Sequence, residues 1–374
     1  MTAQQHPSHE SLFTPTTIGG VDLTNRVALS PMTRVSATAE GLATDRMGTY
    51  YRIFAEGGFG LLITEGIYTD EQASQGYLFQ PGIATAAQAK AWQRIVDGVH
   101  AAGAKFFAQL MHAGSQSQGN PRTTATWGPS AVRPKGEQAA NYRGSGAYQT
   151  PDEMTTEQIG QVRAGFVNAA RMARDAGFDG VEIHGANGYL VDEFLTDYLN
   201  TRSDEYGGSV ANRARFAAEV CHDVADAVGA DMATGIRISQ GKVSDNRYKW
   251  TGGEDDAAVI FSALGETGID YIHTTEYRAL APAFGGTGKT LAELAKQYSG
   301  LALIVNGHLD DPRDAAAVID SGIADVVALA KPALANRDWP RRVQTGRPLT
   351  PDAPAELFGP IADIKDSEVV PLDD

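Results

Sequence analysis

The chain has 374 residues, of which 42% are hydrophobic, and a formal net charge of −15. This composition supplies a large core and allows either two ordinary domains or one large α/β barrel. The acidic balance, without any basic stripe, argues against a nucleic-acid partner.

Cys221 is the only cysteine, which excludes a disulfide framework, a thiolate zinc site and an iron–sulfur cluster held by several Cys. Its surroundings, RFAAEVCHDVADAV, predict a small buried residue on an amphipathic helix. The start, MTAQQHPSHESLF, lacks the basic and apolar regions of a secretory signal, and no apolar stretch approaches the ~20 residues that cross a bilayer. We therefore expect a cytoplasmic protein with no membrane partner and no metal.

Apolar segments of strand length alternate with segments of helical spacing along the chain. The expected strands are 26–32, 59–66, 104–112, 178–185, 233–239, 270–276, 302–307 and 324–330. The clearest helical segments are 86–103, 155–177 and 311–322, and the first and third reach a Gly where a C-cap falls. The strands are almost continuously apolar, which is typical of a parallel sheet buried on both faces.

This alternation predicts one (β/α)8 TIM-barrel domain over residues 1–374. A doubly wound sheet is the alternative, but ALSPMTRVS lacks the Gly-rich fingerprint that normally follows its first strand. Turn residues in LFTPTTIGGVDLTN (12–25) predict an N-terminal β-hairpin that closes the bottom of the barrel. Residues 113–155 greatly exceed the usual loop of ~2–6 residues, so we expect a lid after strand three. A C-terminal tail begins at about residue 360.

Polar residues follow the strands, and the carboxyl ends of the strands form the catalytic face of such barrels. The candidates are Pro31, Met32, Thr33, Gly66, Gln109, Met111, His184, Asn187, Tyr189, Arg237, Asn306, Gly307, Ala330 and Lys331. Lys331 and the backbone of Gly307 predict a phosphate site after strands seven and eight. Thr33, Gln109 and Arg237 can donate hydrogen bonds to a flat, electron-rich heterocycle. Flavin mononucleotide (FMN) fits this division.

Four longer motifs carry a family resemblance: LTNRVALSPMTR, AEGGFGLLITEG, QGYLFQPGI and HGANGYLVDEFLTDYLNTRSDEYGGSVANRARF. From Leu12 to about Phe358 the chain resembles the Old Yellow Enzyme family of FMN-dependent ene-reductases. The resemblance implies a non-covalently bound FMN, NADPH or NADH as hydride donor, and a ping-pong cycle. The implied oxidants are small activated alkenes such as enones, maleimides and nitroalkenes.

The resemblance also implies a role for each matched position. It places Thr33 near the reactive flavin nitrogen, and it assigns further cofactor contacts to Pro31, Met32, Gly66, Gln109, Arg237, Asn306, Gly307, Ala330 and Lys331. His184 and Asn187 would hold the oxygen of the substrate, and Tyr189 would protonate its α-carbon. Tyr77 and Met111 would line the substrate site. Polar residues of 200–215 would brace the loop after strand four.

Four departures from the family pattern stand out. Met111 occupies a place where relatives commonly have Trp, Lys331 stands where Arg is usual, the C-terminal tail lacks a Tyr, and Gly66 replaces an Ala seen in some relatives. A related reductase type with an iron–sulfur cluster is excluded by the single Cys221. The remaining alternative is a flavin-free barrel lyase or isomerase that uses His184 and Tyr189 on a phosphorylated substrate. The sequence leaves open the physiological substrate, the choice between NADPH and NADH, and the choice between monomer and homodimer.

Overall fold

The computed structural model describes residues 9–372, so the first eight residues of the expected start and the last two of the tail lie outside the described part. Eight parallel strands form a closed barrel, which confirms the predicted fold. They are β3 (Val27–Leu29), β4 (Leu61–Ile63), β6 (Lys105–Met111), β9 (Gly180–Asn187), β10 (Ala233–Lys242), β11 (Tyr271–Thr275), β12 (Ala302–Asn306) and β13 (Val326–Leu329). An additional short strand, β5 (Ile67–Tyr68), pairs with the end of β6.

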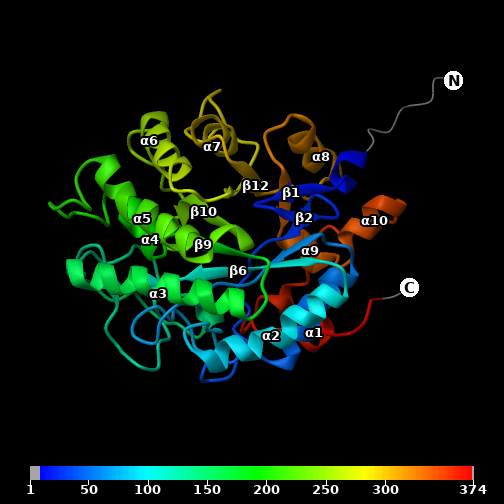
Figure 1. The fold of residues 1–374 in the computed structure, drawn as a ribbon, viewed down its shortest axis with the longest axis horizontal. Coiled ribbons are helices and arrows are strands. Elements are labelled where there is room, and N and C mark those ends of the chain that lie inside the picture. Colours follow the sequence, from blue (N-terminus) through cyan, green and yellow to red (C-terminus); the bar gives the residue numbers. More distant parts are fainter. Residues whose placement is uncertain (1–8, 373–374) are drawn as a thin grey trace.

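Helices surround these strands (Figure 1). They are α1 (Asp45–Glu56), α2 (Ala86–Ala101), α3 (Thr156–Asp175), α4 (Leu190–Leu195), α5 (Val210–Val228), α6 (Glu254–Gly265), α7 (Leu291–Ser299), α8 (Pro312–Asp320), α9 (Lys331–Ala335) and α10 (Trp339–Thr345). Thr85 and Thr155 form capping boxes at the starts of α2 and α3, which fixes where these helices begin. Cys221 lies fully buried on α5, as its apolar surroundings predict. Between residues 9 and 372, no helix is long and apolar enough to span a membrane.

The N-terminal hairpin consists of β1 (Thr16–Ile18) and β2 (Val21–Leu23), which pair antiparallel as expected. Ile18 and Leu23 pack into the lower barrel interior together with apolar strand residues such as Phe107 and Tyr271. The hairpin therefore closes the bottom of the barrel with apolar surface. At the other end the interior becomes polar, which leaves that end for chemistry.

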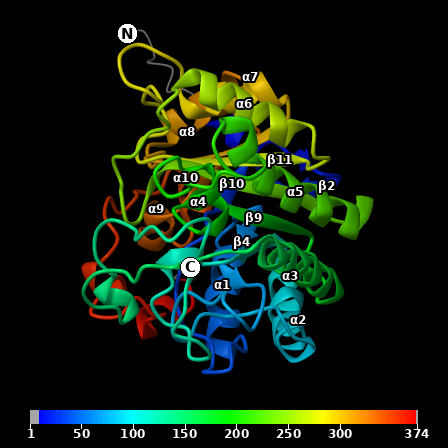
Figure 2. The same ribbon diagram turned by 90° about the vertical axis from the view of Figure 1, so that its left-hand side faces the viewer.

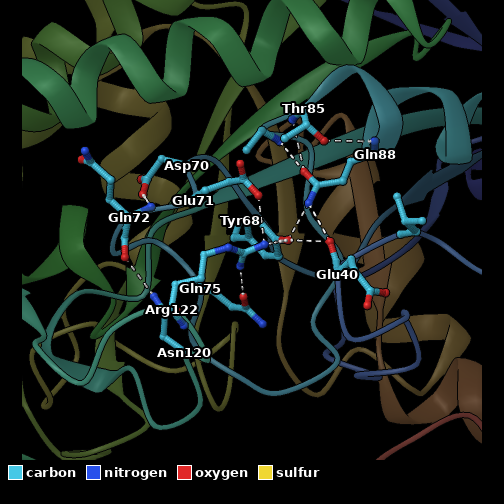
Figure 3. A network of polar contacts seen from close by, with 12 residues as sticks. Glu40, Tyr68, Asp70, Glu71, Gln72, Gln75, Thr85, Gln88, Asn120 and Arg122 are labelled. Atoms are coloured by element: carbon cyan, nitrogen blue, oxygen red, sulfur yellow. Dashed lines mark hydrogen bonds and ion pairs between the residues drawn. The ribbon is translucent and has the colours of Figure 1, made fainter.

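The lid (residues 113–155) contains the short strands β7 (Trp127–Gly128) and β8 (Asp152–Glu153), which pair with each other. Its first half is tied to the segment after β5 (Figure 3). Arg122 donates to the side chains of Gln75 (2.8 Å) and Glu71 (3.0 Å), and Asn120 donates to the carbonyl oxygen of Gln72 (3.2 Å). These contacts fix the base of the lid against the barrel.

The C-terminal segment (residues 355–372) lies beside the lid, as Figure 2 shows for the red and teal chains. The backbone N–H of Ala362 donates to the carbonyl oxygen of Asn141 in the lid (2.9 Å). Further along, Glu368 forms a bidentate, buried ion pair with Arg34, with N–O distances of 2.7 and 2.5 Å. Arg34 follows β3, so this ion pair holds the C-terminal segment over the mouth of the barrel.

Candidate active site

A cavity of about 330 Å³ lies at the carboxyl ends of β3, β9 and β13. It brings together eight of the residues expected from the sequence: Pro31, Met32, Thr33, Tyr77, Asn187, Tyr189, Ala330 and Lys331. A second cavity, of about 610 Å³, adjoins it, because Asn187 and Val243 line both. The strand ends thus surround a large open volume on one face of the barrel, where the sequence places the site.

Tyrosine hydroxyls meet in the smaller cavity. The hydroxyl oxygens of Tyr77 and Tyr189 lie 2.6 Å apart and share a hydrogen bond. Burial raises the pKa of Tyr189 above its usual value of 10, and the hydrogen bond with Tyr77 offsets only part of that rise. The ring of Tyr142, from the lid, packs on Tyr77 at a centroid distance of 4.8 Å. Tyr189 is therefore held as a neutral phenol in a fixed position.

His184 lies directly behind Tyr189, with ring centroids 4.8 Å apart. Its side chain is buried, and its Nδ1 atom has no hydrogen-bond partner within the described chain. Burial, followed by the neighbouring positive charge of Arg237, lowers the pKa of His184 well below 6.5. A buried imidazole without its full set of partners is costly, which indicates that a bound ligand completes its hydrogen bonding.

At the mouth of the barrel, Arg237 is a second buried side chain whose hydrogen bonding is incomplete. Its Nη2 atom donates to the side-chain oxygens of Ser30 (3.1 Å), Thr275 (3.2 Å) and Asn306 (3.1 Å), whereas its buried Nε has no partner. Within residues 9–372 the guanidinium makes no ion pair within 4 Å. Burial lowers the pKa of Arg237 to about 10. A buried cation with a free donor fits an electron-rich or anionic ligand at this point.

Below Arg237, a polar layer crosses the barrel interior. Gln109 Nε2 donates to Glu182 Oε1 (2.8 Å), and the other oxygen of Glu182 lies 2.9 Å from Nδ1 of His273. Burial alone would raise the pKa of Glu182, but His273 and the other hydrogen-bonded and charged neighbours hold it below its usual value. The amide nitrogen of Gln109 thus points into the barrel. Glu182 supplies the negative charge that balances this layer.

Where strands β12 and β13 end, the backbone leaves room for a ligand to approach it closely. Gly307 has a φ of +139°, and a Cβ there would lie 2.1 Å from the carbonyl oxygen of Glu276, so only glycine fits. Asn306 donates to the carbonyl oxygen of Ala328 (2.7 Å), which links the two strand ends. Lys331 begins α9 and is exposed, with its ammonium 5.7 Å from the centre of the Phe358 ring.

On the β3 and β4 side, Glu65 fixes the segment that carries Thr33. Its carboxylate accepts from the backbone N–H groups of Arg34 (3.0 Å) and Val35 (3.1 Å), and burial raises its pKa to about 7. Gly66 leaves room for Met111, because a Cβ at position 66 would lie 2.4 Å from the Met111 sulfur and that side chain would have to move. Met111 packs in turn with Tyr77 and Tyr189.

The cavity also contains residues that the sequence did not single out. They are Arg34, Tyr142, Val243, Leu334, Leu357, Phe358 and Ala362. Tyr142 belongs to the lid, and three of the others belong to the C-terminal segment. These parts have no periodic pattern, and their only signals are a few aromatic residues in a largely polar loop and the dipeptide Leu357-Phe358. The braces expected in 200–215 are present: Asn200 donates to two backbone carbonyls and Arg202 donates to carbonyls of Pro129 and Met154.

Comparison with known proteins now defines the class. The model of the NADH:flavin oxidoreductase / NADH oxidase family matches residues 11–350. A putative 12-oxophytodienoate reductase 11 from Oryza sativa subsp. japonica is 37% identical over 346 residues, covering 90% of this chain and 91% of that protein. Chanoclavine-I aldehyde reductase from Penicillium roqueforti is 36% identical and covers 93% of each chain.

Comparison with solved structures gives the same class. The old yellow enzyme homologue from Zymomonas mobilis has a TM-score of 0.86 at 32% identity, covering 96% of this chain and 98% of that one. Morphinone reductase in complex with tetrahydroNAD has a TM-score of 0.81 at 32% identity, covering 93% and 94%. The chain therefore belongs to the NADH:flavin oxidoreductase / NADH oxidase family. More particularly, it is an FMN-dependent oxidoreductase of the Old Yellow Enzyme type, which removes the flavin-free lyase alternative.

The residues of the site fit an FMN. The free donor of buried Arg237 suits the polar edge of a flavin ring, and the exposed cation of Lys331 suits a phosphate. Gly307 allows the backbone to approach such a phosphate closely. Arg237 lies on β10, Gly307 directly follows β12, and Lys331 begins α9 after β13.

Proposed function

We propose that this protein is an ene-reductase that uses NADPH or NADH to reduce the C=C bond of small activated alkenes. The observation that carries the proposal is the grouping of His184, Asn187 and Tyr189 at one end of β9, where Asn187 and Tyr189 line the cavity and His184 packs against Tyr189. The relatives named as oxophytodienoate, chanoclavine aldehyde and morphinone reductases support this substrate class. The structure of morphinone reductase with tetrahydroNAD supports a nicotinamide donor.

FMN would be held by residues at the strand ends that the family resemblance assigns to it. These residues are Pro31, Met32, Thr33, Gly66, Gln109, Arg237, Asn306, Gly307, Ala330 and Lys331. When bound, FMN would supply the hydride chemistry that links the nicotinamide nucleotide to the β-carbon of the alkene. The nicotinamide nucleotide and the alkene use the same cavity in turn, which gives ping-pong kinetics.

His184 and Asn187 act on the oxygen of the substrate. As the β-carbon gains a hydride, negative charge develops on the carbonyl or nitro oxygen. Neutral donors fixed at that oxygen stabilise the transition state more than the ground state. His184 remains neutral because burial lowers its pKa, so it acts as a hydrogen-bond donor rather than as an acid.

Tyr189 supplies the second hydrogen as a proton to the α-carbon. Its raised pKa keeps the phenol protonated at neutral pH, so the proton is present whenever a substrate arrives. A phenol is a weak acid, but an enolate is basic enough to take its proton. Tyr77 and Met111 pack together and form the wall of the substrate site next to Tyr189.

A matched pair of substrates tests the proposed function. We expect the enzyme loaded with FMN to convert 2-cyclohexen-1-one to cyclohexanone at the expense of NADPH. It should leave 2-cyclohexen-1-ol unchanged, because its C=C bond is not conjugated to a carbonyl, so no negative charge can develop on an oxygen held by His184 and Asn187. Equal consumption of both alkenes, or of neither, would contradict the proposed function.

We expect the Tyr77→Phe variant to slow the proton-transfer step by roughly 3- to 10-fold, the value of one ordinary hydrogen bond. The variant keeps the ring that packs on Tyr142 but loses the 2.6 Å contact with the hydroxyl of Tyr189. The measurement is the rate at which 2-cyclohexenone reoxidises the reduced enzyme. The rate of flavin reduction by NADPH is the internal control, and an equal loss in both rates would contradict this role for Tyr77.

The pH dependence of alkene reduction should contain no contribution from His184. Its pKa lies below 6.5 and that of Tyr189 lies above 10, so neither changes charge between about pH 6 and 8. Rate profiles for the wild type and His184→Asn should have the same shape, with the variant slower throughout. A limb near the ordinary pKa of histidine, present in the wild type and lost in the variant, would show that His184 acts as an acid.

A further inference from the structure

Asn187 occupies an unusual backbone conformation at the end of β9. Its φ is +63°, and the next residue, Gly188, has a φ of +84°. The N–H of Asn187 donates to Ser239 Oγ (2.8 Å), and its carbonyl oxygen accepts from the N–H of Val243 (3.0 Å) and from Gln116 Nε2 (2.9 Å). The turn is therefore held by contacts from β10 and from the start of the lid.

An ion pair lies directly beneath this turn. Lys242 Nζ is 2.8 and 2.9 Å from the two oxygens of Asp192, and both side chains are 0% exposed. The N–H of Gly188 donates to Asp192 Oδ2 at 2.6 Å. Lys242 is also the residue of β10 that pairs with Asn187, after a shift in the β9–β10 register. One buried ion pair thus joins the end of β10 to α4, with Asn187 and Gly188 between them.

Stability alone does not explain this pair. Burying two charges has a desolvation cost that often exceeds their mutual attraction, and an apolar pair of similar volume frequently does as well or better. What the ion pair supplies is a fixed geometry for the turn at Asn187 and Gly188. The carboxylate can face the ammonium and the Gly188 N–H together only when the turn has its observed geometry. The same geometry fixes where the amide of Asn187 points.

We propose that Asp192 and Lys242 are positioning residues for alkene reduction, acting through Asn187. The inference rests on the proposed function, because it assumes that Asn187 binds the oxygen of the substrate. Neither Asp192 nor Lys242 touches the substrate in this account. Their effect on the rate must therefore disappear when the side chain of Asn187 is removed.

A double-mutant cycle tests this dependence. The variants are Asp192→Asn, Asn187→Ala and the combination of the two, each loaded with FMN and assayed with 2-cyclohexenone under saturating NADPH. Asp192→Asn should lower kcat/KM by about 10- to 100-fold when Asn187 is present, because small misplacements of a binding group have effects of this size. In the Asn187→Ala background the same change should alter kcat/KM by no more than ~2-fold, because the group that it positions is then absent; additivity itself holds only to about this factor.

Controls separate positioning from general loss of structure. Asp256→Asn weakens another largely buried pair, Arg213–Asp256 (3.6 Å), away from the turn, and should leave kcat/KM unchanged in both backgrounds. FMN content from the visible spectrum and the unfolding temperature are measured for every variant. If Asp192→Asn does not hold FMN, the Asp192→Leu/Lys242→Met pair replaces it in the cycle, since that variant leaves no lone buried charge.

The outcomes divide clearly. Strong coupling between positions 192 and 187, with normal FMN content, supports positioning through Asn187. Additive effects overturn it, as does loss of FMN in both versions of the cycle, because the pair then serves only the fold. If the wild type itself does not reduce 2-cyclohexenone, that result contradicts the proposed function itself rather than the positioning role alone.

Discussion

The Tyr189→Phe variant should reduce alkenes about 10²–10⁴-fold more slowly than the wild type, the usual contribution of a positioned general acid. The change removes one oxygen atom from a buried ring that packs against His184 and Tyr77. The packing of the ring is kept, so FMN content should not change. The effect should fall on the step in which the α-carbon gains its proton.

Two half-reactions measured separately make this prediction specific. Reduction of the flavin by NADPH transfers no proton to an alkene carbon, so the variant should retain that rate within a few-fold. Reoxidation by 2-cyclohexenone should show the whole loss. A nitroalkene provides a useful control, because its reduced anion is stable enough to leave the enzyme and take a proton from water. Equal slowing of both half-reactions would mean that Tyr189 shapes the cavity rather than supplies the proton.

The Glu368→Gln variant should lower the free energy of unfolding by about 3–5 kcal/mol, the cost of leaving one charge of a buried pair without its partner. Both side chains are almost fully buried, and Arg34 also donates to the carbonyl oxygen of Asp363 (2.9 Å). Removing the negative charge leaves the guanidinium without a hydrogen-bonded counter-charge, because the nearby Glu65 carboxylate bonds to the backbone N–H groups of Arg34 and Val35 instead. The C-terminal segment should then separate from the mouth of the barrel more readily.

Urea unfolding measures this loss, and Asp366→Asn is the matched control. Asp366 pairs with Arg46 at 2.6 Å, two residues away in the same segment, but its side chain is 97% exposed. An exposed pair typically contributes ~0–1 kcal/mol, so the control should lie close to the wild type. Equal midpoints for the two variants would show that the Arg34–Glu368 pair does not hold the segment in place.

The barrel itself was predictable because its signals are local. Each strand is a short, almost continuously apolar run, and helical segments such as 86–103 and 155–177 are Ala-rich with a helical spacing of apolar residues, so the alternation can be read without knowledge of contacts. The same alternation locates the ends of the strands, and therefore the polar residues that lie there. The hairpin of 16–23 was marked by its Gly19-Gly20 turn.

The rest of the site depends on contacts between distant parts of the chain. Arg34 and Glu368 are 334 positions apart, and Tyr142 meets Tyr77 across the lid. No periodic pattern marks such pairs. Glu182 was missed for a related reason: it lies within an apolar strand, and its partner His273 is 91 positions away. Departures from an apolar pattern inside a barrel strand are the signal that could have found it.

The central claim is that this protein transfers reducing equivalents from a nicotinamide nucleotide to an activated alkene through bound FMN. The most direct measurement is the visible spectrum of the purified, FMN-loaded enzyme without oxygen, first after addition of NADPH and then after addition of 2-cyclohexenone. The account predicts flavin bands that bleach with NADPH and return with the enone, with one equivalent of cyclohexanone formed. A protein that binds no FMN, or whose bleached flavin does not recover its colour with the enone, would contradict it.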